Sequence, residues 1–307
     1  MPDGTCSYCS GTPVYRREHE GVSFCSSCFR EAIEERFRRT VIRNRMLEFN
    51  DNIAVAVSGG KDSLTLLHLL VKLEKRFPRS NLTAVSVDEG IDGYRDEGLE
   101  LAKTACSKLG VKQLVVSYRD LFGTTTDEIA SLKLGQTPCS YCGVFRRKAI
   151  NKAAVMAGAT KIATAHNLDD EVQTVLLNML HGDPTRIIRS GPVLRDPRGR
   201  FLPRVKPLCD IPEKEIVLYA YLTGIEFQTI ACPHSHEALR NDIRSFLNQM
   251  EVKHPGTKFT LLRSADKLRE LMGEDAVLSE LHECVKCGDP TSHELCEACA
   301  MLQVILA

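Results

Sequence analysis

A phosphate-binding segment is the clearest chemical signal in this sequence. Residues 58–63 read Ser-Gly-Gly-Lys-Asp-Ser, directly after the β-branched run 53–57 and directly before the leucine-rich residues 64–70. This order of residue types predicts a strand, a tight loop and the start of a helix. Because a helix N-terminus carries unpaired N–H groups and the positive end of the helix dipole, it is a place where phosphate binds.

The side chains of this loop suit a polyanionic ligand. Gly59 and Gly60 let the backbone approach a phosphate closely, Ser58 and Ser63 supply hydroxyl donors, and Lys61 supplies a compact cation. The spacing differs from the Walker sequence G-x-x-x-x-G-K-S/T. An ordinary structural turn is the alternative interpretation.

Cysteine spacing indicates two metal sites, one near each end of the chain. The first set is Cys6, Cys9, Cys25 and Cys28, and the second is Cys284, Cys287, Cys296 and Cys299. Four thiolates suit a closed tetrahedral zinc site. A segment of about 25 residues cannot bury enough core alone, so metal binding would supply its folding free energy. We therefore expect two structural Zn²⁺ ions.

The remaining cysteines leave several chemistries open. Cys139 and Cys142 form a third C-x2-C pair, and Cys232 lies in a loop after an apolar stretch. The pair alone could be a redox dithiol or a persulfide carrier. Three thiolates could instead hold a [4Fe–4S] cluster and leave one iron open. Cys106 is expected in a helix core, and spacing assigns no role to Cys209.

Composition limits the class of protein. The chain has 307 residues, 40 Lys and Arg against 40 Asp and Glu, and no run of about 18 apolar residues. A membrane span is therefore not expected, and the lack of an apolar signal core makes the cytoplasm the expected compartment. Zero net charge means that any nucleic-acid site must be a local patch.

Strand and helix patterns alternate through the middle of the chain. Strands are predicted at 53–57, 82–87, 111–116 and 161–165, and helices near 63–76, 96–109, 143–157, 168–181 and 212–223. This alternation predicts an α/β fold with a doubly wound parallel sheet. Ligands of such sheets bind beyond the carboxyl ends of the strands. Residues 58–63, 88–90 and 166–170 should therefore lie together.

The pattern divides the chain into five parts. They are an N-terminal zinc finger at 1–30, a linker helix at 31–49, a catalytic domain at 50–235, a helical extension at 236–279 and a C-terminal zinc finger at 280–307. The linker belongs to a predicted helix over 29–48 that is rich in arginine.

Basic residues gather in three segments despite the zero net charge. They are the arginine helix, residues 143–168, which carry no acid, and residues 185–206, which carry one. Such runs can neutralise RNA phosphates, although a solvated surface is the alternative. The candidate RNA contacts are Arg39, Arg43, Arg147, Arg186 and Arg189.

Four segments in combination resemble one enzyme family. They are Ser-Gly-Gly-Lys-Asp-Ser at 58–63, Val-Asp-Glu-Gly-Ile-Asp-Gly-Tyr-Arg-Asp at 87–96, Cys-Ser-Tyr-Cys-Gly-Val-Phe-Arg-Arg at 139–147 and Ala-His-Asn-Leu-Asp-Asp-Glu at 165–171. They resemble the tRNA 2-thiouridine synthetases, which are PP-loop enzymes of the TtcA and TtuA type. The archaeal and eukaryotic cytosolic tRNA thiolation branch is the most similar, and the likeness includes the flanking fingers.

The resemblance implies an activity and its cofactors. It implies the adenine nucleotide α-hydrolase-like fold of PP-loop ATP pyrophosphatases, in which ATP and Mg²⁺ adenylate the C2 oxygen of a tRNA uridine and sulfur then displaces AMP. It implies that Cys139, Cys142 and Cys232 hold a [4Fe–4S] cluster whose open iron binds sulfide. The sulfur would come from sulfide or from the thiocarboxylate of a ubiquitin-like carrier, and the enzyme would be a homodimer.

The resemblance also assigns roles to single residues. Residues 58–63 form the pyrophosphate loop with Asp62 near Mg²⁺, Asp88 and His166 belong to the ATP site, and Asp170 is catalytic. Arg146 stands where the TtuA branch has a catalytic lysine. Because a guanidinium stays charged, its role should be electrostatic, and this difference favours the wobble uridine over the T-loop uridine as the target.

Purely structural roles are the alternative interpretation for some of these residues. Asp169 and Asp170 could simply cap a helix, and His166 could pack at a strand end. The competing activities are T-loop thiolation, a cysteine-persulfide relay without a cluster, a PP-loop ligase acting on a small molecule, and a zinc module that only binds tRNA.

Overall fold

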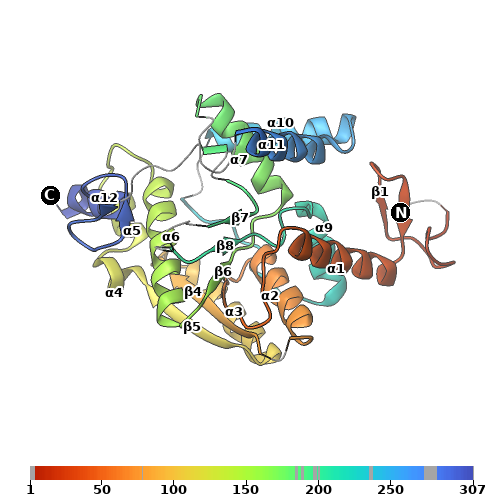
Figure 1. Ribbon diagram of the computed structural model, residues 1–307, viewed down its shortest axis with the longest axis horizontal. Coiled ribbons are helices and arrows are strands. Elements are labelled where there is room, and N and C mark those ends of the chain that lie inside the picture. Colours follow the sequence, from red (N-terminus) through yellow and green to blue (C-terminus); the bar gives the residue numbers. More distant parts are fainter. Residues whose placement is uncertain are drawn as a thin grey trace.

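The structure, a computed structural model, places helices on both faces of one central sheet (Figure 1). It describes residues 4–77, 79–183, 186–187, 190–195, 199, 201–234, 238–272 and 282–306. No helix among these residues is long and apolar enough to cross a lipid bilayer.

The sheet has six strands in the order β5-β4-β3-β6-β8-β7. The strands are β3 (Asn52–Ala56), β4 (Asn81–Asp88), β5 (Lys112–Ser117), β6 (Lys161–Ala163), β7 (Val193–Leu194) and β8 (Arg204–Val205). All neighbours pair in parallel except β7, which is antiparallel to β8. The predicted doubly wound parallel sheet is confirmed. The antiparallel edge was not predicted because two-residue strands carry no alternation pattern.

The helices agree with the predicted pattern, with two informative shifts. They are α1 (Ser26–Arg43), α2 (Lys61–Glu74), α3 (Arg95–Leu109), α4 (Tyr118–Phe122), α5 (Thr126–Ser131), α6 (Pro138–Met156), α7 (Leu168–Leu180), α9 (Glu213–Thr223), α10 (Ala238–Lys253), α11 (Thr257–Met272) and α12 (Glu297–Leu306). Helix α1 ends before Glu48, because Arg45 has a φ of 46°. Helix α6 begins before Gly143, because Thr137 accepts a hydrogen bond from the Ser140 N–H and Pro138 stands in the first turn.

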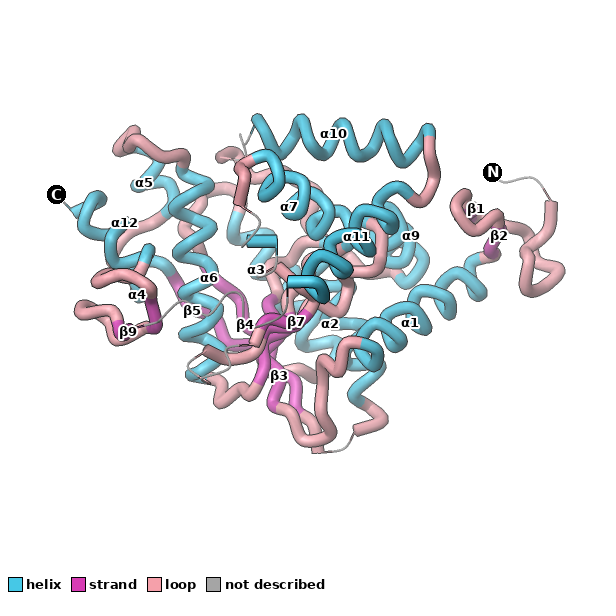
Figure 2. The backbone as a smooth tube through the Cα atoms, turned by 45° about the horizontal axis from the view of Figure 1, so that its top comes forward, coloured by secondary structure: helices cyan, strands magenta, loops and turns pink. Residues whose placement is uncertain are grey.

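The two four-cysteine units lie at opposite ends of the molecule (Figures 1 and 2). The N-terminal unit contains the hairpin of β1 (Tyr15–Arg17) and β2 (Val22–Phe24). The C-terminal unit contains β9 (His282–Glu283), β10 (Pro290–Thr291) and the start of α12. The central sheet and its helices separate the two units.

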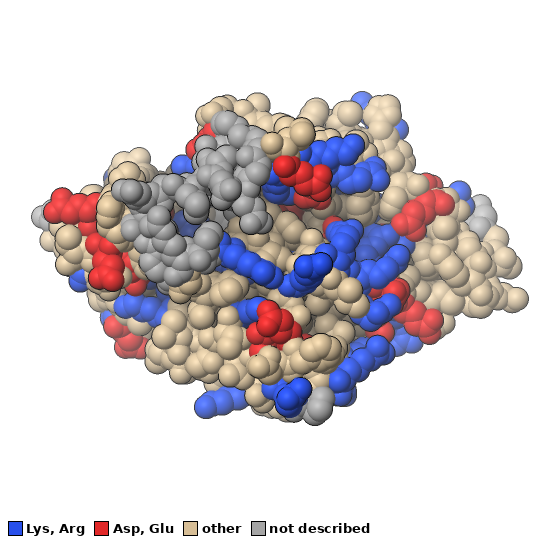
Figure 3. Space-filling model, in the orientation of Figure 1, with Lys and Arg blue, Asp and Glu red and all other residues tan. Residues whose placement is uncertain are grey.

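A hollow of about 1290 Å³ lies between α1, α11 and the N-terminal unit. Figure 3 shows basic side chains gathered on both sides of this hollow, on the surface where α1 and α11 face each other. Since the chain has no net charge, this is a local concentration of positive charge, which we call the α1–α11 groove.

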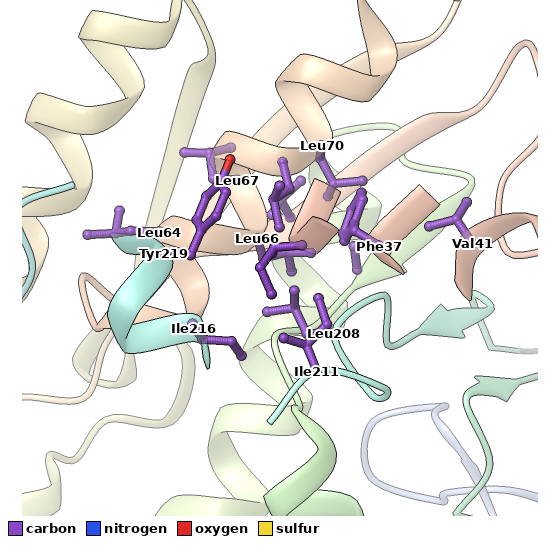
Figure 4. Packing of buried hydrophobic residues seen from close by; sticks show 14 of the residues in the cluster. Phe37, Val41, Leu64, Leu66, Leu67, Leu70, Leu208, Ile211, Ile216 and Tyr219 are labelled. Atoms are coloured by element: carbon purple, nitrogen blue, oxygen red, sulfur yellow. The ribbon is translucent and has the colours of Figure 1, made fainter. Parts of the chain in front are cut away.

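Most of the core lies in two apolar layers on the two faces of the sheet, and a smaller buried cluster joins α7, α10 and α11. Alternate residues of β3 point to opposite faces, so Ile53 and Val55 join one buried cluster and Ala54 joins the other. The first layer packs α1, α2 and α9 together (Figure 4). Its labelled residues are Phe37, Val41, Leu64, Leu66, Leu67, Leu70, Leu208, Ile211, Ile216 and Tyr219. This packing fixes α2, and with it the loop that precedes α2.

A buried ion pair fastens the N-terminal unit to α9. Arg17 donates two hydrogen bonds of 2.8 Å to the carboxylate of Glu215. The exposed fractions of the two side chains are 4% and 0%, and the Tyr15 hydroxyl donates to the same carboxylate. Removing one partner from a buried pair leaves the other charge buried without compensation.

We expect Arg17→Met to lower the free energy of unfolding by about 3 kcal/mol, the lower end for a broken buried pair. The reason for the lower end is that Arg36 lies 3.7 Å from Glu215 and still offers a positive charge. Urea unfolding would measure the loss in the free energy of unfolding, and limited proteolysis would report how firmly residues 4–25 are held. The control is Arg16→Met, because Arg16 pairs with Glu18 at the surface and should change stability by less than about 1 kcal/mol. Equal losses in both variants would contradict the assignment.

Candidate active site at the carboxyl edge of the sheet

Three predicted segments meet at one edge of the sheet. Strand β3 pairs in parallel with β4 on one side and with β6 on the other. The residues after these strands, beginning at Val57, Glu89 and Thr164, therefore come to the same edge. This edge is the topological switch point, where ligands of doubly wound sheets bind.

The phosphate-type loop is held in a conformation that requires glycine. Gly59 has a φ of +86°, and a Cβ on it would lie 2.1 Å from the carbonyl oxygen of Gly98. The Ser58 N–H donates to the Ser63 hydroxyl at 3.0 Å, which closes the loop. Gly60 is the N-cap of α2 and no side chain caps this helix. The first-turn N–H groups of α2 therefore suit an anionic ligand.

An acidic group faces this helix from α7. Asn167 caps α7 by accepting from the Asp170 N–H, and the Asp170 carboxylate accepts from the Asn167 N–H. The side-chain amide of Asn167 also donates to Asp62 at 3.0 Å. The capping interpretation of Asp170 is therefore correct, and the same cap connects Asp170 to the loop residue Asp62. Asp169 instead pairs with Lys258 of α11.

Glu213 is a site residue that the sequence reasoning missed. Lys61 Nζ lies 2.8 Å from a carboxylate oxygen of Asp62 and 2.8 Å from one of Glu213. Burial alone would lower the pKa of Lys61, but these two carboxylates outweigh burial and raise the pKa. Glu213 stands in the first turn of α9, where a carboxylate is common for helix-dipole reasons alone, so no sequence signal separated it from a capping residue.

Two ionisable side chains at this edge of the sheet have shifted pKa values. Burial, with the carboxylates of Asp62 and Glu213, raises the pKa of Asp170 to about 6. His166 is exposed at one side, but the protein atoms around its ring exclude much of the water, and with nearby positive charges this lowers the pKa of His166 to about 3. The imidazole is therefore neutral at pH 7, and Nδ1 lies 3.0 Å from the Thr164 hydroxyl. Asp88 accepts from the Gly90 N–H and thereby shapes the turn after β4.

Arg95 supports the loop from behind. Its guanidinium donates to the backbone carbonyls of Ser58 and Val87 at 2.7 Å each, and it lies 2.8 Å from the Glu89 carboxylate. Arg95 and Glu89 are both buried. Sequence reasoning assigned neither residue a role, because nothing in a linear pattern shows that an arginine points into the protein.

Contacts connect the three candidate cluster cysteines to one another and to this edge of the sheet. Cys139 and Cys142 occupy the first turns of α6, and the Cys139 thiol donates to the His234 carbonyl oxygen at 2.8 Å. That bond brings the loop of Cys232 to α6. Burial and the nearby sulfur of Cys142 raise the pKa of Cys232. The loop also pairs with the phosphate-type loop, since the Gln228 N–H donates to the Gly59 carbonyl at 3.0 Å.

The path from Gln228 to Cys232 is short. Because four residues span at most about 14 Å, Cys232 lies within about that distance of Gln228, whose N–H contacts Gly59 of the phosphate-type loop. Cys142 is connected to that loop by side chains: Arg146 lies 3.1 Å from the Cys142 sulfur and 2.8 Å from Glu89, which binds Arg95. The Arg146 side chain is half exposed; the surrounding protein atoms disfavour its charge, but Glu89 and Cys142 outweigh this effect and raise the pKa of Arg146.

The two terminal cysteine sets fit tetrahedral metal sites. Within each set the four sulfur atoms all lie within 4.8 Å of one another. Measured separations are 3.5 Å for Cys9 and Cys25 and 3.6 Å for Cys287 and Cys296. Thiolates bound to one Zn²⁺ at about 2.3 Å stand about 3.8 Å apart in a tetrahedron. Both donor sets therefore suit a tetrahedral zinc ion.

Several basic residues of the predicted RNA runs point inward. Lys148 pairs with Asp289, Lys161 with Asp51 and Lys206 with Glu171, and all three lysines are buried. These three lysines therefore do not contribute to the RNA contacts expected of the basic runs. The linear pattern hid their acidic partners, which come from distant segments.

The named RNA candidates are mostly exposed. Arg39 and Arg43 border the α1–α11 groove, where Arg43 also pairs with Asp210. Arg147 lies 3.7 Å from Glu297, and Arg186 lies 3.1 Å from Asp183. Arg189 lies outside the described residues.

Comparison with known proteins decides the family. Residues 31–251 match the family described as the PP-loop domain. The chain is 38% identical over 305 residues to the cytoplasmic tRNA 2-thiolation protein 1 of Chlamydomonas reinhardtii, and the match covers 99% of this chain and 85% of that protein. The chain belongs to the PP-loop family of tRNA 2-thiolation proteins. The predicted family is thus confirmed.

Other members of the tRNA 2-thiolation family are alike over their full length. The tRNA 2-thiolation protein NcsA of Haloferax volcanii is 35% identical, with 98% of this chain and 99% of that protein covered. The solved structure of the U34-tRNA thiolase NcsA from Methanococcus maripaludis, with its [4Fe–4S] cluster, has a TM-score of 0.86 and 34% identity. It covers 99% of this chain and 97% of that chain.

The displaced titration of Asp170 makes a prediction about stability. An acid whose pKa is raised in the folded protein costs stability once it ionises, so its contribution falls as the pH rises from about 4 to about 6. We expect Asp170→Asn to be more stable than the parent protein at pH 7, by at most about 3 kcal/mol, with the difference vanishing near pH 4. Urea unfolding across this pH range measures it.

The neighbouring Asp169→Asn is the matched control for this experiment. It leaves Lys258 buried without its carboxylate, so it should destabilise the protein at pH 7. An Asp170→Asn protein that is less stable than its parent at pH 7 would contradict the assigned cause.

Proposed function

We propose that this protein catalyses the ATP-dependent 2-thiolation of a tRNA uridine. The carrying observation is a chain of contacts through Arg95, Glu89 and Arg146 that connects the phosphate-type loop to the candidate cluster ligand Cys142. The names of the relatives support tRNA and sulfur transfer as the chemistry.

ATP and Mg²⁺ fit the loop side of the cleft. The first turn of α2 and Lys61 would hold the phosphates that leave as pyrophosphate, while Asp62 and Asp170 would hold Mg²⁺. Lys61 and Asn167 both contact the Asp62 carboxylate. With ATP bound, a phosphate would replace Asp62 as the partner of Lys61, and Mg²⁺ would replace these contacts at Asp62. Asp88 and the neutral His166 are the proposed further contacts of the nucleotide.

The reaction balances without a redox partner. The uridine C2 oxygen attacks the α-phosphorus of ATP, and pyrophosphate leaves. A sulfur nucleophile then adds at C2, and the C2–O bond breaks as AMP departs with that oxygen, so sulfur replaces oxygen. The target base must leave any stack for C2 to be reached.

Cys139, Cys142 and Cys232 are the proposed ligands of a [4Fe–4S] cluster, each binding a different iron. The U34-tRNA thiolase that shares the fold carries such a cluster, and the Cys139 thiol contacts the loop of Cys232 through the His234 carbonyl oxygen. When bound, such a cluster supplies an open iron that holds a sulfur nucleophile. Arg146 would stabilise the negative charge at Cys142.

The wobble uridine is the proposed target. Arg146, a residue that cannot readily act as a base, stands where the T-loop branch has lysine, and a U34-tRNA thiolase shares the fold at a TM-score of 0.86. Sulfide or a thiocarboxylate carrier remains the proposed donor, and a homodimer the proposed assembly.

Cysteine variants test the cluster. We expect Cys139→Ser, Cys142→Ser and Cys232→Ser to lose iron and tRNA thiolation under anaerobic conditions, because each removes one ligand. Iron content, the visible spectrum and mass spectrometry of thiolated tRNA measure this. The control is Cys106→Ala, since Cys106 is buried in α3 away from the cleft. A colourless, iron-free protein that still thiolates tRNA would instead support a persulfide relay.

The α1–α11 groove is the proposed path of the tRNA backbone. Its lining includes five arginines, Arg36, Arg38, Arg39, Arg43 and Arg263, against three acids, Glu20, Asp210 and Asp266. Arg39 and Arg43 are 68% and 66% exposed, so their charges reach solvent. The groove reaches Asp210, three residues before Glu213 of the active site. A tRNA whose phosphates bind in the groove would therefore present a base from one of its loops near Glu213.

Salt dependence tests this path. We expect the double variant Arg39→Gln with Arg43→Gln to bind tRNA more weakly and to reduce the slope of log K against log salt by about 1 per lost phosphate contact. Fluorescence anisotropy between about 50 and 200 mM salt gives the slope. Arg119→Gln is the control, because Arg119 is exposed and ion-paired outside the groove. An unchanged slope in the double variant would exclude the groove while leaving the thiolation proposal standing.

A further inference from the structure

The two four-cysteine units pack against different parts of the molecule. Cys284, Cys296 and Cys299 belong to the same buried cluster as Cys142 and Phe145 of α6. The N-terminal unit, through Phe24 and Phe29, belongs to the cluster of α1, α2 and α9 on the other face of the sheet. The C-terminal unit therefore touches the helix that carries two candidate cluster ligands.

One lysine joins α6 to the C-terminal cysteines. Lys148 Nζ lies 3.0 Å from the Cys287 sulfur and 3.7 Å from the Cys296 sulfur, and it pairs with Asp289. Its side chain is 8% exposed. A buried ammonium needs anions around it, because leaving a charge without partners costs several kcal/mol. In the C-terminal unit those anions are the cysteine sulfurs and Asp289.

Metal binding makes this contact stronger. Four thiolates and one Zn²⁺ carry a net charge of −2 in formal terms, so the unit attracts Lys148 when its metal is bound. Outer groups of this kind orient metal ligands and typically change metal affinity by about 10- to 100-fold. Without the metal, the four sulfurs are no longer held around a common centre beside Lys148.

The contact is close to Cys142 along the helix. Lys148 follows Cys142 by six residues, which is about 9 Å of axial rise in an α-helix. The stretch between them includes Phe145, which is fully buried. A displacement of α6 at Lys148 should therefore reach the first turns of the helix rather than be absorbed between them.

We propose that the C-terminal four-cysteine site, acting through Lys148, positions α6 and thereby Cys139 and Cys142, whereas the N-terminal site has no such effect. Lys148 is thus a positioning residue that connects a structural metal to the reaction cleft. The inference rests on the proposed function only for the consequence at the cluster; the mechanical coupling is separate from it.

A matched pair of variants tests the coupling in the full-length protein. Cys287→Ser and Cys9→Ser each remove the second cysteine of the first C-x2-C pair of a unit, and both cysteines are exposed. Each variant should lose one zinc. We expect Cys287→Ser alone to increase amide hydrogen exchange over residues 138–146 in the cluster-free protein, and alone to lower iron occupancy after anaerobic reconstitution. Zinc and iron analysis with exchange mass spectrometry reports all three quantities.

Lys148 variants test the residue itself. We expect Lys148→Met to release zinc from the C-terminal site to a chelator about 10- to 100-fold more readily and to raise exchange over residues 138–146. Lys148→Arg keeps the charge and should restore most of both properties. Lys103→Met, at an exposed lysine of α3, should change neither.

The outcomes separate the two proposals. Cys287→Ser and Lys148→Met proteins with parental exchange over residues 138–146 would overturn the coupling, as would an equal effect of Cys9→Ser. A parent protein that binds no iron would overturn the cluster part of the proposed function, while the exchange comparison would still decide the coupling.

Discussion

The carboxylate of Glu89 connects the two halves of the candidate active site. It lies 2.8 Å from the guanidinium of Arg95 on one side and 2.8 Å from that of Arg146 on the other. Arg95 in turn fixes the backbone of Ser58, and Arg146 contacts the Cys142 sulfur. Because Glu89 and Arg95 are buried, neither charge is tolerated without its partner. The distance between the nucleotide loop and α6 therefore follows from this one group of ions.

The cleft carries charge at a cost to the stability of the ligand-free protein. Asp62 and Glu213 flank Lys61, and burial together with the charges of these two carboxylates raises the pKa of Asp170 to about 6. Such a cluster is unfavourable in the absence of a cation, because like charges repel in a partly dehydrated site. Carboxylates kept under these conditions are typical of functional sites. The apolar layer that packs around α2 stabilises the fold and offsets the unfavourable energy of these carboxylates.

The parts of the site that the sequence reasoning found share a physical origin. Residues 58–63, 88–90 and 166–170 follow buried parallel strands, and parallel strands bring their carboxyl ends to one edge whatever the loops contain. Arg95, Glu89 and Glu213 were missed because each acts through a partner distant in the sequence: Arg95 contacts Ser58, 37 residues away, Glu89 contacts Arg146, 57 residues away, and Glu213 contacts Lys61. Lys148, Lys161 and Lys206 were misjudged for the same reason: a lysine beside other basic residues in sequence can face an acid from another segment.

The sequence by itself determined the strand–loop–helix phosphate motif, the parallel sheet and the two zinc-type cysteine sets, because each depends on residues near one another in the chain. The alternation of buried residues and the C-x2-C spacing are local properties that tertiary contacts do not alter. Tertiary structure alone decided which charges face the cleft, which pair in the interior, and how the loop of Cys232 comes to Cys139 through the His234 carbonyl. These contacts join segments up to 198 residues apart, and the energy of a charge depends on its surroundings in space.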